Sequence, residues 1–149
     1  SDNSMISRFP QGATPDLPPP RPRLTAAELA TAELCYPKVL IGNDYRCVDA
    51  IGLVSIGRYW PLSHVPSDDE IDVAYRWLGR VARIYRPGTC SYRLKHFAER
   101  WSGAYVCNGA MIVAAYQCHF TIAADHDATN ADIAVSTQSL ALLPEAVQS

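Results

Sequence analysis

Apolar residues are concentrated most densely between Ser91 and Phe120. In the first half of this segment they recur at i, i+3, i+4 and i+7, as Leu94, Phe97, Ala98 and Trp101. This spacing places the four side chains on one face of a helix. The hydroxyl of Ser91 can accept a hydrogen bond from an amide of the first turn, so we expect Ser91 to be the N-cap of this helix.

A second helix is predicted from about Tyr105 to His119, after a break at Ser102 and Gly103. It has almost no polar face before Gln117, and a helix that is apolar nearly all round is normally buried. Small residues would let neighbouring elements pack close to it, namely Gly109, Ala110, Ala114 and Ala115. We therefore expect this helix to form the centre of the core.

The first helix of the chain is predicted from its N-terminal signals. Thr25 and Glu28 form a capping box, in which each side chain can bond the backbone of the other residue. Leu24 and Leu29 have the spacing of a hydrophobic staple. These signals predict a helix from Thr25 to about Cys35.

A further helix is predicted from Ser67, which forms a capping box with Glu70, to the break at Pro87 and Gly88. Acidic residues occupy its first turns, where the helix dipole favours anions. Its apolar face is expected to contain Ile71, Tyr75, Leu78, Ala82 and Tyr85. Its later turns carry the arginines Arg76, Arg80, Arg83 and Arg86.

The remaining segments carry weaker signals. KVLIGND at 38–44 indicates either a short strand with a Gly-Asn turn or the end of a helix. We expect a short helix within 36–64, because a long loop without structure is uncommon in a compact domain. FTIAA at 120–124 and ADIAVS at 131–136 predict a β-hairpin, and residues 137–149 predict a weak helix.

These elements predict a mainly α (α+β) fold, with one small helical domain over residues 24–149 and a short C-terminal β-hairpin. Residues 1–23 are predicted to be a proline-rich arm, extended or disordered, since six of the eleven prolines lie there. Alternatively, this arm lies along a partner or a neighbouring subunit, with Arg21 and Arg23 offering positive charge.

The composition, 48% hydrophobic and 19% charged over 149 residues, is that of a soluble globular protein. The longest apolar run is too short for a membrane span and the N-terminus lacks a signal pattern, so we expect a cytoplasmic protein without a membrane partner. The five cysteines follow no metal-binding spacing, and no cofactor is expected. Cys90, between Arg86 and Arg93, has the setting that best suits a reactive thiol.

Charge is distributed unevenly along the chain. From Arg76 to Arg100 there are seven cationic residues and one carboxylate, a net charge of +6 in a chain whose total is −2. This asymmetry is typical of proteins that bind nucleic acid or another polyanion, although arginines can also complement a helix dipole and pair with acidic residues elsewhere. The candidate binding residues for a partner or a nucleic acid are Arg76, Arg80, Arg83, Arg86, Arg93, Lys95, His96, Arg100, Arg21 and Arg23.

Helical spacing would arrange these cations in two stripes. Arg76, Arg80 and Arg83 form one stripe, and Arg93, His96 and Arg100 form the other. The element order from 68 to 136 also suits a winged helix, but the third helix has no arginine to read bases. Phosphate contacts are therefore the expected mode if nucleic acid binds.

Two constellations could serve an enzyme. Ser91, His96 and Glu99 could form a nucleophile with a base, since His96 and Glu99 share a helix face. The other candidate set, as metal ligands, is His119, Asp125, His126 and Asp127. A solvated surface pair and a polar turn explain the two sets more simply, so we expect neither catalytic residues nor a metal site.

The central segment also resembles small uncharacterised proteins carried by bacterial phages and other mobile elements, in the patterns S-Y-x-L-K-H-x-x-E-x-W and Y-V-x-N-G-A-x-I-x-A-A. The matching residues are Ser91, Tyr92, Leu94, Lys95, His96, Glu99, Trp101, Tyr105, Val106, Asn108 to Ala110, Ile112, Ala114, Ala115, Asn130, Ala131 and Ile133. His119 departs from the glycine that the pattern has before Phe120. The resemblance implies an accessory or host-interacting protein.

The sequence therefore favours a non-enzymatic accessory protein that binds a protein partner or forms a homo-oligomer. Aromatic residues near arginines support this hypothesis, because Tyr, Trp and Arg are enriched at binding hot spots. They are Tyr59, Trp60, Trp77, Tyr92 and Trp101. The alternative is a DNA- or RNA-binding accessory factor that contacts phosphates through the basic segment 76–100.

Overall fold

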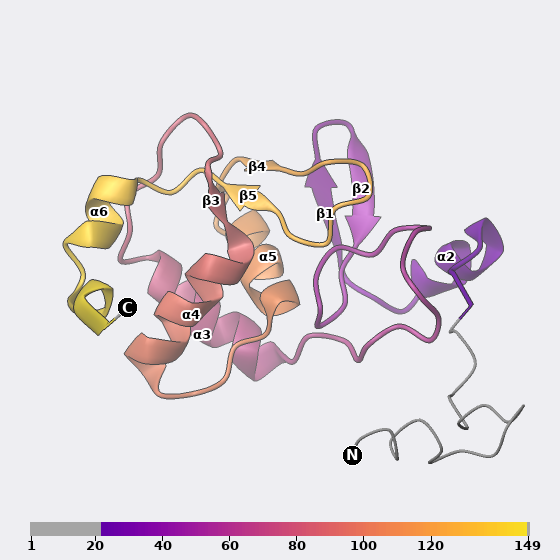
Figure 1. Ribbon diagram of the computed structural model, residues 1–149, viewed down its shortest axis with the longest axis horizontal. Coiled ribbons are helices and arrows are strands. Elements are labelled where there is room, and N and C mark those ends of the chain that lie inside the picture. The colour runs from indigo at the N-terminus through magenta and orange to yellow at the C-terminus, as the bar shows by residue number, and fades with distance from the viewer. Residues whose placement is uncertain (1–21, 149) are drawn as a thin grey trace, which may run out of the picture.

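Helix α5 (Asn108–Gln117) is the central element of the computed structural model, which describes residues 22–148 (Figure 1). All residues from Asn108 to Ala115 are buried. They pack against α3 (Asp68–Leu78) and α4 (Ser91–Ser102). The prediction of a buried core helix is confirmed, with a regular helix somewhat shorter than predicted.

Helix α4 faces the core with the predicted residues, Leu94, Phe97 and Ala98, while Trp101 is partly buried. Its start differs from the prediction, because Cys90 is the N-cap residue and Ser91 is the first residue of the helix. The buried Ser91 hydroxyl accepts a hydrogen bond from the amide of Ala131 at 3.1 Å. Ser91 therefore joins α4 to the strand region and does not cap the helix.

Helix α3 begins where predicted, with the hydroxyl of Ser67 accepting a bond from the amide of Glu70 at 3.2 Å. It ends at Leu78, well before the predicted break, so the prediction of one long helix is wrong. The chain turns at Gly79 and Arg80 and then pairs with a distant segment. The amide of Ile84 donates to the carbonyl of Ala134 at 2.9 Å.

The buried face of α3 also differs from the predicted one. Its buried residues are Ala74, Trp77 and Leu78, whereas Tyr75, Ala82 and Tyr85 are exposed. The spacing of four and three continued past the end of the helix, where it no longer describes one face. Of the predicted apolar face, Leu78 is therefore buried and Ile71 partly buried, and the other three residues are exposed.

The predicted hairpin is present as β4 (Ile122–Ala123) and β5 (Asp132–Ile133), which pair antiparallel. A third strand, β3 (Thr89–Cys90), pairs with the other edge of β5. A two-residue strand has too few positions for an alternating pattern, which is why the sequence did not reveal β3. The predicted weak C-terminal helix corresponds to α6 (Thr137–Ala141) and a 3-10 turn, η1 (Pro144–Gln148).

The N-terminal part of the described chain holds α2 (Ala26–Ala32) and a β-hairpin. The capping box of Thr25 and Glu28 is present, although α2 ends earlier than predicted. The strands β1 (Lys38–Ile41) and β2 (Asp44–Cys47) pair antiparallel across a two-residue turn. The strand interpretation of KVLIGND is therefore confirmed.

Residues 36–64 contain no helix, so the prediction of a short helix there is wrong. The buried carboxylate of Asp49 organises this segment instead, accepting hydrogen bonds from the amides of Ile51, Gly52 and Ser63. Main-chain donors bonded to a buried carboxylate do not need helical partners. A single aspartate in a loop gives no sequence pattern from which this role of Asp49 could be predicted.

Buried side chains form two clusters. The larger surrounds α5, and the smaller consists of Leu24, Ala32, Cys47 and Val54 near α2 and the hairpin. Figure 1 shows α2, β1 and β2 on one side of α5 and α6 with η1 on the other. The fold is a small mixed α+β fold, whereas the predicted arm lies almost wholly outside the described residues.

Candidate binding surfaces

The first predicted cationic stripe is broken, because α3 ends before Arg80. Arg76, on the helix, pairs with Asp72 at 3.0 Å and lies over the ring of Trp101. The guanidinium of Arg80 donates to the carboxylate of Glu145 at 2.7 Å. Both arginines therefore have acidic partners within the fold.

Arg83 and Arg100 donate to main-chain carbonyls. Arg83 bonds the carbonyls of Cys118 and His119, each at 3.0 Å, just beyond the end of α5. Arg100 bonds the carbonyl of Glu145 at 3.2 Å. The two side chains therefore satisfy main-chain acceptors within the fold.

Lys95, a candidate binding residue in the sequence, is buried on α4. Its side chain is 6% exposed, and its ammonium lies 2.9 Å from the carboxylate of Glu99. The rings of Tyr92 and Tyr105 lie within 5.2 and 4.7 Å of the same ammonium. His96 approaches the other oxygen of Glu99 at 2.9 Å, so one carboxylate joins both predicted residues.

The Glu99 carboxylate acts as an anchor. Burial raises the pKa of this carboxyl, but hydrogen bonds from Lys95, the amide of Val106 and His96 outweigh burial and hold the pKa below its ordinary value. A carboxylate with a lowered pKa is a weak proton acceptor. Through the amide of Val106, which donates to it at 3.1 Å, the charged carboxylate attaches the loop before α5 to α4.

The other predicted residues are dispersed. Arg86 and Arg93 are exposed and form no ion pair with any residue between 22 and 148, although Arg93 lies over the ring of Phe97. Arg23 lies over the ring of Tyr59, 5.6 Å from its centroid. Arg21 is outside the described residues. The first predicted stripe is not formed, whereas Arg93, His96 and Arg100 share one face of α4.

The enzyme constellations are not assembled. The buried Ser91 hydroxyl bonds Ala131 and makes no bond to His96. Within residues 22–148 no group of three or more His, Cys, Asp or Glu side chains could hold a metal ion. Burial raises the pKa of the Cys107 thiol to about 12.

The position of α5 argues against a winged helix. In that arrangement the third helix enters the major groove. Here the corresponding helix is α5, which is buried from Asn108 to Ala115. It has no free face that could meet a duplex.

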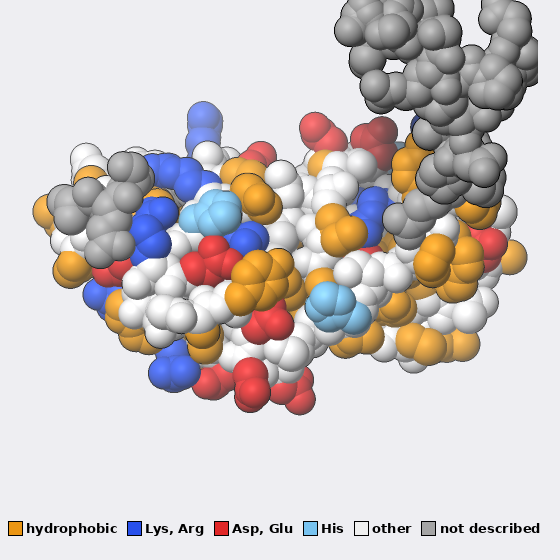
Figure 2. Space-filling view, turned by 60° about the horizontal axis from the view of Figure 1, so that its bottom comes forward, with side chains coloured by type: hydrophobic (Ala, Val, Ile, Leu, Met, Phe, Trp, Pro, Cys, Tyr) orange, Lys and Arg blue, Asp and Glu red, His pale blue; other side chains and the backbone are white. Residues whose placement is uncertain are grey.

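Exposed hydrophobic side chains are concentrated in residues 22–65, which we call the apolar half. This segment is about a third of the described chain but contains eight of its fourteen large exposed hydrophobics. These eight are Leu34, Leu40, Tyr45, Ile51, Ile56, Tyr59, Trp60 and Val65. In Figure 2, hydrophobic side chains gather over the part that carries α2 and the hairpin, whereas Lys and Arg lie mainly over the opposite part.

A groove of about 410 Å³ lies beside β2, and we call it the hairpin groove. Its apolar lining includes Leu29, Val54 and the buried Cys47. Its other lining residues are Glu33, Asn43, Asp44, Tyr45, Arg46, Ser55, Ile56 and His126. Its volume lies within the range of ligand-binding pockets.

A second groove of about 420 Å³ lies beside the loop that contains Pro61, and we call it the Pro61 groove. It is lined by Ile51, Gly57, Arg58, Tyr59, Pro61, Leu62 and Ser63. Residues 22–24 run antiparallel to this loop, because the amide of Trp60 donates to the carbonyl of Pro22 at 2.9 Å. All residues that line the two grooves, except His126, lie in the apolar half.

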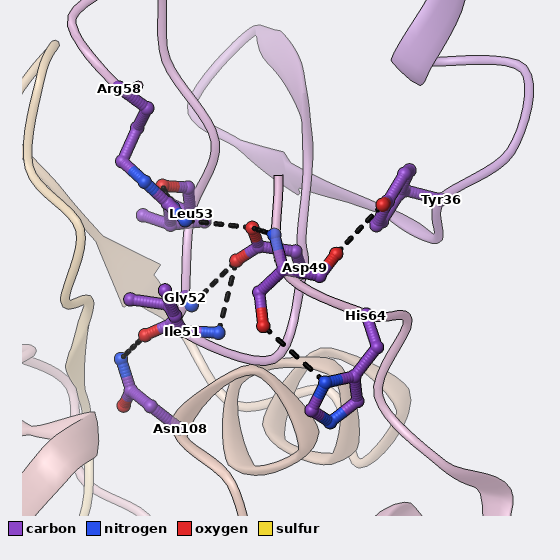
Figure 3. Close-up of polar contacts among 9 residues, drawn as sticks. Tyr36, Asp49, Ile51, Gly52, Leu53, Arg58, His64 and Asn108 are labelled. Carbon is purple, nitrogen blue, oxygen red and sulfur yellow. Dashed lines mark hydrogen bonds and ion pairs between the residues drawn. The ribbon is translucent and has the colours of Figure 1, made fainter. Parts of the chain in front are cut away.

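The Asp49 network fixes a loop whose residues line both grooves; Figure 3 shows its polar contacts. Arg58 donates to the Asp49 carboxylate at 2.7 Å and to the carbonyl of Leu53 at 2.9 Å. Asn108 donates to the carbonyl of Ile51 at 2.8 Å, which ties the loop to α5. The exposed residues of this loop are thus presented from a fixed backbone.

Sequence reasoning named Tyr59 and Trp60 but missed Tyr45, Ile51 and Ile56. A strand signal was available for Tyr45, because it lies four residues from Val39-Leu40-Ile41 across a Gly-Asn turn. Ile51 and Ile56 lie in an irregular loop, and the Asp49 contacts determine which of its residues face solvent. These contacts join positions up to fourteen residues apart, so a local sequence pattern does not reveal them.

Among residues 22–148, no helix has the length and apolar character that crossing a bilayer requires. Comparisons of the chain with protein-family models, with curated proteins and with solved structures found no match.

Proposed function

We propose that this chain is a non-enzymatic accessory protein that binds another protein through its apolar half. The observation that carries the proposal is the concentration of exposed hydrophobic side chains in residues 22–65, four of which line the two grooves, namely Tyr45, Ile51, Ile56 and Tyr59. Contiguous apolar surface on a folded protein commonly marks an interaction site. The resemblance to phage and mobile-element proteins favours a host partner or a second copy of the chain.

The rigidity of this surface supports the proposal. Asp49 and Arg58 hold the loop that presents Ile51, Tyr59 and Trp60. Side chains held in a fixed arrangement lose little conformational entropy when a partner binds. Tyr and Trp are also frequent at interface hot spots.

The nucleic-acid alternative has less support. Arg80, Arg83 and Arg100 are bonded to acceptors within the fold, and Lys95 is buried against Glu99. Contacts with phosphates would require these side chains to leave existing partners. Arg86 and Arg93 alone would give a much weaker phosphate contact than six cations.

A pull-down from the native host, with nuclease-treated and mock-treated arms, tests the proposal. The double variant Ile56→Ser with Tyr59→Ser changes one exposed residue at each groove. The control is Tyr85→Ser with Leu142→Ser, at exposed positions outside the apolar half. We expect a protein that the wild type and the control retain after nuclease treatment and that the groove variant loses.

Light scattering of the purified chain supplies the self-association arm of the same experiment. A concentration-dependent dimer that the groove variant abolishes identifies the partner as a second copy. Retention of the partner by the groove variant, or loss of capture after nuclease treatment, contradicts the proposal. A monomer that captures no protein also contradicts it.

A further inference from the structure

We propose that the free edge of β2 and the hairpin groove bind an extended, basic peptide segment of a partner protein, which adds to the sheet as a strand. This inference rests on the proposed protein-binding function and names the partner's chemistry. Extended peptides bind sheet edges through main-chain hydrogen bonds, while pockets beside the edge select their side chains.

The direction of the backbone groups along β2 follows from its pairing. The amide of Val48 donates to the carbonyl of Pro37 at 2.9 Å, and the register pairs Arg46 with Val39. Bonding groups alternate between the two edges of a strand, so those of Asp44, Arg46 and Val48 face β1. Those of Tyr45 and Cys47 face away from β1.

Only part of this outer edge is paired. The carbonyl of Cys47 accepts a bond from the amide of Val54 at 2.9 Å, and Val48 forms a bridge with Leu53. Continuing this pairing would place Tyr45 opposite Ile56. Neither the amide nor the carbonyl of Tyr45 has a partner among residues 22–148.

The main-chain groups of Tyr45 lack partners because the segment after Val54 turns away from β2. The amide of Arg58 donates to the carbonyl of Ser55 at 2.9 Å, which closes a turn directly after Val54. Tyr45 and Ile56 both line the hairpin groove, which therefore occupies the place of the missing strand pairing. Two unpaired main-chain groups and an adjoining groove are the elements that strand addition uses.

The lining of the groove indicates the charge of its ligand. Glu33 and Asp44 line it, and neither carboxylate has an ion pair or a hydrogen bond within the described part of the chain. Arg46 also lines it, but its guanidinium donates to the carbonyls of Asp125 and Ala128 at 2.9 and 3.0 Å. A basic side chain on the added strand would complement the two carboxylates. An apolar side chain would contact the apolar lining of the groove, which includes Leu29 and Val54.

Hydrogen exchange of the free full-length chain, followed amide by amide, gives the first test. We expect the Tyr45 amide to exchange rapidly while the amides of Asp44 and Arg46, which face β1, exchange slowly. Slow exchange at Tyr45 at all protein concentrations would mean that the chain covers its own edge. Slow exchange that appears only at high concentration would mean that a second copy covers it, and either result overturns the proposal.

Selection of peptides from a randomised linear library on the immobilised full-length chain gives the second test. We expect alternating sequences with apolar and Lys or Arg residues. Tyr45→Pro removes the outward amide and leaves the inward ladder bonds, so it should weaken the selected peptide at least tenfold. Leu40→Pro is the matched control, because Leu40 pairs with Tyr45 in the register and its amide faces the opposite edge of the hairpin.

The double variant Glu33→Gln with Asp44→Asn tests the charge. It should weaken the selected basic peptide about three- to tenfold, as expected for partly exposed ion pairs. Acidic selected sequences, no selected peptide at all, or equal binding by the Tyr45→Pro and Leu40→Pro variants would overturn the proposal. The proposed function stands separately if the host partner still depends on Ile56 and Tyr59.

Discussion

The amide of Gly109 donates a hydrogen bond to the carbonyl of Ala50 at 3.2 Å, joining the first turn of α5 to the loop after β2. The two segments approach so closely that a Cβ atom at position 109 would overlap the carbonyl oxygen of Asp49. This contact connects the apolar half to the buried core helix. It also requires glycine at the second position of α5.

Gly109→Ala should destabilise the fold by about 3 kcal/mol, because the added methyl group meets backbone atoms that cannot rotate away. Urea denaturation measures this loss. Gly88→Ala is the control, since nothing lies within 4 Å of a Cβ there, and we expect a change of less than about 0.5 kcal/mol. Equal stabilities of the two variants would disprove the close approach.

Ala114→Leu should destabilise the fold by about 1–3 kcal/mol through overpacking, because Ala114 is fully buried in α5. Thermal unfolding followed by circular dichroism provides the measurement. Gln117→Leu places the same side chain at an exposed position of the same helix and should be nearly neutral. A neutral Ala114→Leu variant would show that the helix is not part of the core.

Acid should destabilise the fold through Glu145 and Glu99. Burial raises the pKa of the Glu145 carboxyl, but hydrogen bonds from Trp77, its own backbone amide and Arg80 bring the pKa below its ordinary value of 4.5. The pKa of Glu99 is lowered as well. A carboxyl with a lower pKa in the folded state stabilises that state above its unfolded pKa, and this contribution is lost as pH falls from about 4.5.

Urea denaturation between pH 6 and pH 3 tests this dependence. Glu145→Gln should reduce stability at pH 6 by about 1–3 kcal/mol and flatten the decline toward low pH, since the variant has no carboxyl to protonate. Asp132→Asn, at an exposed position of β5, is the control and should keep the full pH dependence. An unchanged pH dependence of stability in Glu145→Gln would show that Glu145 does not contribute to the acid destabilisation.

Arginine variants distinguish the protein-binding proposal from the nucleic-acid alternative. Arg80→Ala with Arg83→Ala should lower the free energy of unfolding by about 1–3 kcal/mol, because Glu145 and the carbonyls beyond α5 lose donors. Arg86→Ala with Arg93→Ala should leave stability within about 0.5 kcal/mol. Fluorescence anisotropy with a random duplex should show no binding at tens of micromolar wild-type protein.

The nucleic-acid alternative predicts the opposite anisotropy result. Six phosphate contacts would give a log-log salt slope of roughly −4 to −6, and loss of Arg80 and Arg83 would flatten it by about two units. Tight, strongly salt-dependent binding by the wild type would therefore refute the protein-binding account. It would also require Arg80 to leave Glu145.

Local signals predicted the elements that depend on local residues. The capping box of Thr25 with Glu28 and the apolar sequence around Ala114 located α2 and α5, because neighbours in sequence determine caps and helix faces. The end of α3 was missed because it depends on Ile84 pairing with Ala134, fifty residues away. Tertiary pairing of this kind overrides a helical pattern.

The same distinction applies to the candidate site. The basic segment was visible in the sequence, but its partners were not, because Glu145 lies sixty-five residues from Arg80. The apolar half gave little signal, since most of its exposed hydrophobic residues, including Ile51, Ile56 and Tyr59, belong to the loop ordered by Asp49. Charge could therefore be counted from the sequence, whereas its availability to a ligand required the fold.

Hydrogen exchange of the full-length chain with and without the host protein that it captures tests the central claim most directly. The account predicts slower exchange within residues 44–60 on binding, with residues 76–100 unchanged and the effect insensitive to nuclease. Protection confined to residues 76–100, or protection that nuclease abolishes, would contradict it.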